Sequence, residues 1–154
     1  MSFASLMNNR RFELSEIDLE DDIDLNLAAA AVMFAVIAAD DEVAKIEIAC
    51  LVDLLRDRYS LESDDLIDIM ISARRAADNE LEISNFVNLL RENLSESERS
   101  LFLDDLWELA CSDKKIRNRE RVAIDRFADA LDLDLEVVAK ARDMAEKKIE
   151  LNLS

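Results

Sequence analysis

The sequence predicts an all-α fold, a single-domain bundle of about seven helices. Residues 27–39 form a run of thirteen residues without a polar side chain, and Asp40 follows it directly. A helix that is apolar on every face must be surrounded by other elements, so this run predicts the central helix. From Ile23 onward apolar residues recur at helical spacing, and no window alternates as a strand would. A chain of 154 residues suits one domain with one core.

The chain is expected to divide into two unequal parts. Residues 1–22 mix charges without a helical period, which predicts a mobile acidic N-terminal arm. Residues 23–154 predict the helical domain. Its helices are expected near residues 23–39, 44–58, 63–77, 82–93, 95–112, 117–131 and 134–150.

Each helix after the central one has an apolar face. The residues that define these faces are, in order, Ile48, Leu51 and Leu55; Leu66, Ile69 and Ala73; Ile83, Phe86 and Leu90; Leu103, Leu106 and Trp107; Ile124, Phe127 and Leu131; Val138, Ala141 and Ala145. Start signals precede three of them. Ser63 is expected to cap the third helix, residues 95–98 read as a capping box for the fifth, and Asp134 is expected to cap the seventh.

Several residue types are absent. The chain has no Gly, Pro or His, and it also contains no Thr or Gln. Without His it lacks the commonest general base and transition-metal ligand, and without Gly it has no phosphate-cradling loop. Enzyme activity is therefore not expected. The composition also leaves open that this is an engineered, reduced-alphabet version of a natural sequence.

Charge is distributed unevenly along the chain. The net charge is −17, and residues 13–68 hold 17 acidic but only three basic residues. Residues 113–126 form one short basic stretch, with six basic and three acidic residues. So much negative charge repels phosphate backbones, so nucleic-acid binding is not expected.

The sequence favours a cytoplasmic protein. The apolar run at residues 27–39 is shorter than the roughly 20 residues of a spanning helix, so membrane insertion is not expected. The N-terminal residues do not resemble a secretory signal. Cys50 and Cys111 are too few for a disulfide framework and fit a reducing compartment.

An internal repeat relates two helical hairpins. A shift of 73 residues places Phe34 on Trp107, Asp40 on Asp113 and Glu47 on Glu120. Each copy has an apolar helix that ends at an Asp, a tight turn, and a Glu near the start of the next helix. Such a turn favours a residue with positive φ, a place held here by Asp41 and Lys114.

This pattern resembles the tellurite-resistance protein TerB family, which includes domains of the DjlA co-chaperone type. The hallmark of that family is an Ala-Asp-Gly-Glu-like turn between two helices, present twice. It is matched by residues 39–43 with Glu47 and, less closely, by residues 112–116 with Glu120. The turn glycine is missing from both copies, and Lys115 makes the second turn basic. The resemblance covers about residues 24–150.

The resemblance implies a non-enzymatic acidic helical module linked to tellurite and stress resistance. It also implies association with metal ions and with a protein partner that is membrane-bound. Asp40, Asp41, Glu42 and Glu47 are then the expected metal ligands, for weak binding of Ca²⁺ or Mg²⁺ through oxygen atoms. Only the first turn is expected to attract a cation, because basic residues surround the second.

Two other interpretations stay open. Glu47 and Glu120 also occupy the N3 position of a capping box, so their role can be purely structural. The chain can equally be a helical adaptor whose acidic face recruits a basic partner without metal, or an engineered scaffold with no function of its own. The sequence does not indicate an oligomeric state.

Overall fold

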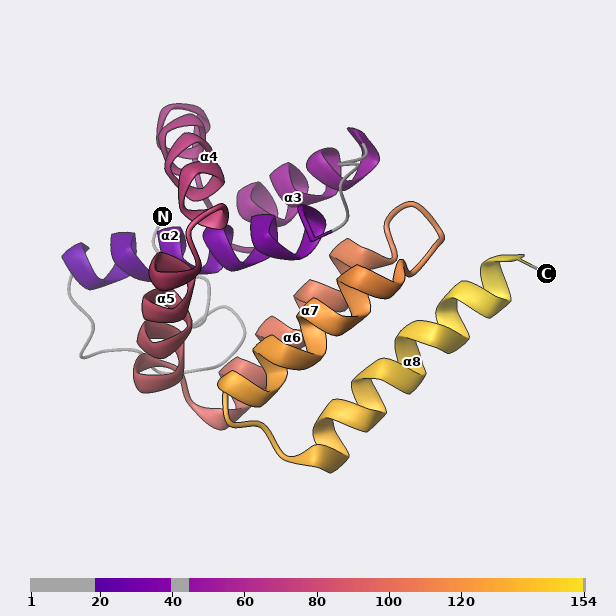
Figure 1. Ribbon diagram of the computed structural model, residues 1–154. Coiled ribbons are helices and arrows are strands. Elements are labelled where there is room, and N and C mark those ends of the chain that lie inside the picture. Colours follow the sequence, from indigo (N-terminus) through magenta and orange to yellow (C-terminus); the bar gives the residue numbers. More distant parts are fainter. Residues whose placement is uncertain (1–18, 40–44, 154) are drawn as a thin grey trace.

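The computed structural model describes residues 19–39 and 45–153, which form seven α-helices and no strand (Figure 1). The predicted all-α fold is therefore confirmed. The helices are α2 (Leu19–Ile37), α3 (Lys45–Asp57), α4 (Ser63–Ala77), α5 (Glu80–Asn93), α6 (Glu96–Ala110), α7 (Asn118–Ala130) and α8 (Leu135–Leu153). Helix α2 begins four residues before the predicted start, and residues 1–18, which make up most of the expected N-terminal arm, lie outside the described residues.

Helix α2 is the centre of the bundle, as the apolar run predicted. It packs against α3, α4, α5, α6 and α7, and Figure 1 shows α4 and α5 crossing it. All six residues from Ala28 to Met33 are 0% exposed. The small alanine side chains let neighbouring backbones come close, while Met33 and Ile37 fill the remaining space.

Helix α6 is the second centre. It packs against α2, α3, α7 and α8, and its side chains Phe102, Leu103 and Leu106 are fully buried. Trp107 of α6 and its repeat equivalent, Phe34 of α2, are both buried in the same core. The two apolar helices of the repeat therefore pack together, and α8 adds an outer layer on α6 (Figure 1).

In the described part of the chain, three helix ends use a left-handed residue although the chain has no glycine. Ser60, Lys114 and Asp132 have φ of 53°, 66° and 58°. Lys114 confirms the positive φ expected for the second repeat turn; Asp41, its equivalent, lies outside the described residues. After α7, the Arg99 guanidinium donates to the carbonyl oxygens of Leu131 and Asp132, which satisfies acceptors at that helix end.

Of the helix N-caps predicted from the sequence, the one at α6 is confirmed and the one at α4 is wrong. The Ser95 hydroxyl and the Glu98 carboxylate form the predicted capping box at α6. The prediction that Ser63 caps α4 is wrong, because the cap position is Glu62, which makes no side-chain capping bond. Leu61 and Leu66, both buried, occupy the two positions of a hydrophobic staple, and their burial places the N-cap at Glu62, while the helix begins at Ser63 as predicted.

Candidate functional site

The first repeat turn is only partly described. Asp40, Asp41 and Glu42, three of the four expected metal ligands, lie outside the described residues. Glu47, the fourth, lies in the first turn of α3 and is 0% exposed. A carboxyl group is rarely buried so completely without a charge partner or a bound ion, so its surroundings are informative.

Glu120 is the neighbour of Glu47. It lies in the first turn of α7, is also 0% exposed, and is the residue that the 73-residue repeat aligns with Glu47. The sequence did not predict that the two carboxyl groups meet. The available signal was the repeat itself, because packing two related hairpins against each other brings equivalent positions together.

The pair strongly perturbs the acidity of Glu120. Burial raises its pKa well above the ordinary value, and the adjacent Glu47 carboxyl raises it further through hydrogen bonding and charge. The backbone amide of Arg117 lowers the same pKa, and Asp113 raises it slightly. Two adjacent buried carboxyl groups cannot both carry an uncompensated negative charge, so at neutral pH this pair favours holding a proton.

The Glu120 carboxyl lies against the Arg117 backbone amide at the start of α7 and against the Glu47 carboxyl. Glu98, at the same N3 position of α6, accepts a 2.8 Å bond through its Oε1 from the Ser95 amide. A buried carboxyl group is costly to ionise next to a second carboxyl group, so Glu120 occupies a site suited to a proton or a cation.

Asp113, an acidic residue of the second repeat turn, bonds to Lys115 and Arg117. Its Oδ1 accepts a 3.1 Å bond from the Lys115 amide, and its Oδ2 lies 3.4 Å from the Arg117 guanidinium. Within residues 19–39 and 45–153 no group of three or more acidic, Cys or His side chains is arranged to hold a metal. The described part of the site therefore supplies two carboxyl groups, Glu47 and Glu120.

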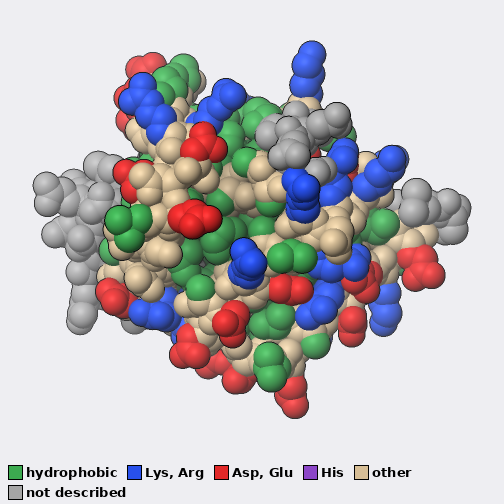
Figure 2. All heavy atoms as spheres, in the orientation of Figure 1, with side chains coloured by type: hydrophobic (Ala, Val, Ile, Leu, Met, Phe, Trp, Pro, Cys, Tyr) green, Lys and Arg blue, Asp and Glu red, His purple; other side chains and the backbone are tan. Residues whose placement is uncertain are grey.

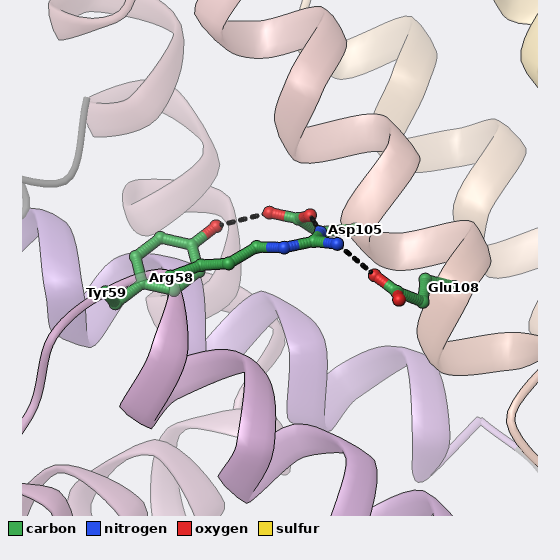
Figure 3. A network of polar contacts seen from close by, with 4 residues as sticks. All are labelled: Arg58, Tyr59, Asp105 and Glu108. Atoms are coloured by element: carbon green, nitrogen blue, oxygen red, sulfur yellow. Dashed lines mark hydrogen bonds and ion pairs between the residues drawn. The ribbon is translucent and has the colours of Figure 1, made fainter. Parts of the chain in front are cut away.

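A second buried carboxylate, Asp105, has the opposite environment (Figure 3). Its Oδ2 accepts a 2.9 Å bond from the Tyr59 hydroxyl, and its Oδ1 pairs with the Arg58 guanidinium. The other end of that guanidinium lies 2.8 Å from Glu108 Oε2. Tyr59 and Arg58 follow α3, whereas Asp105 and Glu108 belong to α6, so this network joins two helices and is structural.

The two cysteines offer no reactive thiol. Cys50 and Cys111 are both free and partly buried. Burial raises the pKa of Cys50, and it raises that of Cys111 to about 11. Thiolate, the nucleophilic and metal-binding form, is therefore suppressed at both positions.

None of the helices in the described ranges is long and apolar enough to cross a bilayer.

Comparison with known proteins gives one finding. The family model described as tellurite resistance protein TerB matches residues 26–143, which is more than half of the chain. No curated protein and no solved structure gives a significant match. The matched range includes both repeat turns and the residues between them.

Proposed function

The chain belongs to the tellurite resistance protein TerB family, and from this premise we propose that it is a non-catalytic cytoplasmic module that binds a divalent cation weakly. The ion would be held by Glu47 and Glu120 together with Asp40, Asp41 and Glu42 of the first repeat turn. The tellurite-resistance and stress role is part of this proposal. The observation that carries it is the buried pair of carboxyl groups, one from each half of the repeat.

The donor chemistry fits a hard cation. Ca²⁺ and Mg²⁺ prefer carboxylate oxygen ligands, and the oxygens of the buried Glu47 and Glu120 pair are of that kind. A bound cation would neutralise the charge that the pair otherwise avoids by keeping a proton. Because two described carboxyl groups are too few for a tight site, the affinity is expected to be on the order of 10⁻⁴ to 10⁻³ M.

The same residues do not favour catalysis. The chain contains no His, and its buried carboxyl groups are 0–2% exposed, which leaves a substrate no direct access to them. The partly buried thiols have raised pKa values. We therefore include the absence of turnover in the proposal.

Thermal unfolding with and without metal tests the cation site. Millimolar Ca²⁺ or Mg²⁺ at ~5 Kd is expected to stabilise the parent by about 1 kcal/mol, a rise of roughly 2–4 °C in Tm. The rise should disappear in Glu120→Gln, in Glu47→Gln and in the double variant Asp40→Asn/Glu42→Gln. Ionic strength must be held constant, because the net charge of −17 responds to salt alone.

Glu98→Gln is the matched control. Glu98 is also a buried Glu at the N3 position of a helix, but it is bonded within its own capping box. This variant should melt lower than the parent and yet keep the full metal-dependent rise. If the parent shows no rise, or if the rise survives in Glu120→Gln, the pair is a structural proton-sharing contact and the metal proposal is wrong.

A further inference from the structure

Helix α4 carries an apolar strip on its solvent side. Ile67 and Ile71, which are spaced i and i+4, are 58% and 51% exposed, and Met70 beside them is partly buried. The opposite face of α4 holds the buried Leu66 and Ala73. Figure 1 shows α4 projecting from the upper edge of the bundle, and Figure 2 shows hydrophobic side chains beside acidic and basic ones on that projection. Single exposed apolar residues are ordinary, whereas adjacent isoleucines on one helix face form a patch that can serve as a contact surface.

Charges of opposite sign lie at the two ends of this strip. Asp64, Asp65 and Asp68 lie in the first half of α4, and Arg74 and Arg75 lie in its last turn. All five side chains are exposed, and within residues 19–39 and 45–153 none of them forms an ion pair. The helix dipole favours the charges of the first and last turns, but it does not account for Asp68 in the second turn.

This order of charges makes α4 complementary to an antiparallel copy of itself. Asp64, Asp68, Ile71 and Arg75 are spaced i, i+4, i+7 and i+11, so they share one face of the helix. When a second α4 runs in the opposite direction along this face, with Ile71 near the centre, Asp68 of each copy lies opposite Arg75 of the other. The two-fold axis produces this ion pair twice. A parallel arrangement would place Asp68 opposite its own copy, and like charges repel.

We propose that α4 is the contact surface of a symmetric homodimer, in which the α4 helices of two copies pack antiparallel. Ile67 and Ile71 of each copy exclude water from the centre, and the aliphatic stem of Arg74 covers Ile67 of the other copy. The two Asp68–Arg75 pairs fix the direction of packing. One helix from each copy buries less than the roughly 1,600 Å² of a standard interface, so the dimer is weak, with a Kd on the order of 10⁻⁴ M.

The net charge of −17 on each copy opposes self-association and determines the solution conditions for a test. At an ionic strength of about 0.15 M the Debye length is about 8 Å, so remote charges are screened while ion pairs in contact persist. A chelator in the same buffer removes any metal ion that could bridge two copies. The measurement is then independent of the cation site proposed at Glu47 and Glu120.

Sedimentation equilibrium from about 10 μM to about 1 mM protein tests the dimer. The parent is expected to change from monomer to dimer over this range. Ile71→Glu, Asp68→Arg and Arg75→Asp should each raise the Kd at least about tenfold. An equimolar mixture of Asp68→Arg and Arg75→Asp should associate with a Kd within about threefold of the parent, because one copy then carries two arginines and the other two aspartates at the paired positions.

Ile46→Glu is the matched control, because Ile46 is 51% exposed, as Ile71 is, but lies on α3. It should leave the Kd within about twofold of the parent. All the substituted side chains are exposed, so each variant is expected to keep the fold, which circular dichroism checks. The proposal is overturned if the parent stays monomeric at about 1 mM, if Ile46→Glu weakens association as much as Ile71→Glu, or if the mixture associates no more tightly than either charge variant alone.

Discussion

At the scale of single residues, the surroundings of two buried carboxyl groups, those of Asp105 and Glu120, show what a buried charge requires. Asp105 has a guanidinium and a phenol hydroxyl against its two oxygens. Glu120 has a second carboxyl group beside it instead. A buried charge needs a partner of opposite sign or good donors, so Asp105 is stabilised in place, while Glu120 depends on a proton or an added cation.

The raised pKa of Glu120 predicts a pH-dependent stability. Glutamate has an ordinary pKa of 4.5, and Glu120 has a higher pKa in the folded protein. At pH values between these two, Glu120 holds its proton only when the chain is folded. The folded state thus binds more protons than the unfolded state in this pH window, so the free energy of unfolding falls as the pH rises. From about pH 5 to pH 8, Glu120→Gln should gain stability relative to the parent.

Urea unfolding at several pH values in the presence of a chelator measures this difference. Glu98→Gln again serves as the comparison, because Glu98 is a buried glutamate at the same N3 position that is bonded within its own capping box. Its stability difference from the parent should not follow the Glu120→Gln trend. Parallel pH profiles for the parent and Glu120→Gln would show that the two buried carboxyl groups do not share a proton.

At the scale of helices, the junction of α3 with α6 depends on the Asp105 network (Figure 3). Tyr59 is 0% exposed and Asp105 is 1% exposed, so the bond between them is shielded from water. Arg58 and Glu108 lie at the edge of the same junction and are partly exposed. The network therefore has a buried centre with a large energetic effect and a solvated edge with a small one.

Substitutions at the centre and edge of this network should differ in their effect. Asp105→Ala leaves the Tyr59 hydroxyl and the Arg58 guanidinium without their shared acceptor and is expected to lower the free energy of unfolding by about 3 kcal/mol. Glu108→Gln removes only the partly exposed ion pair and should cost less than about 1 kcal/mol. Chemical denaturation of both variants checks this order. Equal losses would mean that the junction is stabilised by the outer pair.

At the scale of the whole molecule, the sequence predicted the features of the fold that depend on local sequence patterns. The apolar run predicted α2, and periodicity predicted each later helix, because a helix has to bury its apolar face whatever the details of packing. The start of α4 at Ser63 was predicted, but its N-cap was missed by one residue because the burial of Leu61 and Leu66 outweighs the preference of Ser63 for a cap.

The site depends on contacts that no local pattern contains. Glu47 and Glu120 are 73 positions apart and meet only when the two hairpins pack. The repeat thus indicated which residues matter, whereas tertiary packing decided which of them lie together.

The central place of α2 leads to the strictest prediction about the whole fold. Ala31 is 0% exposed on a helix that packs against five others, so no side of it can shift toward solvent. Ala31→Asp would bury an unpaired charge, whose cost of several kcal/mol is comparable with the 5–15 kcal/mol that stabilises a typical domain. The variant is expected to be unfolded or molten by near-UV circular dichroism at 25 °C. Ala139→Asp, on the exposed face of the outer helix α8, should melt within a few degrees of the parent. A folded Ala31→Asp protein with native-like melting would contradict the packing of α2 at the centre of the bundle, since only a helix with an open face can accommodate that charge.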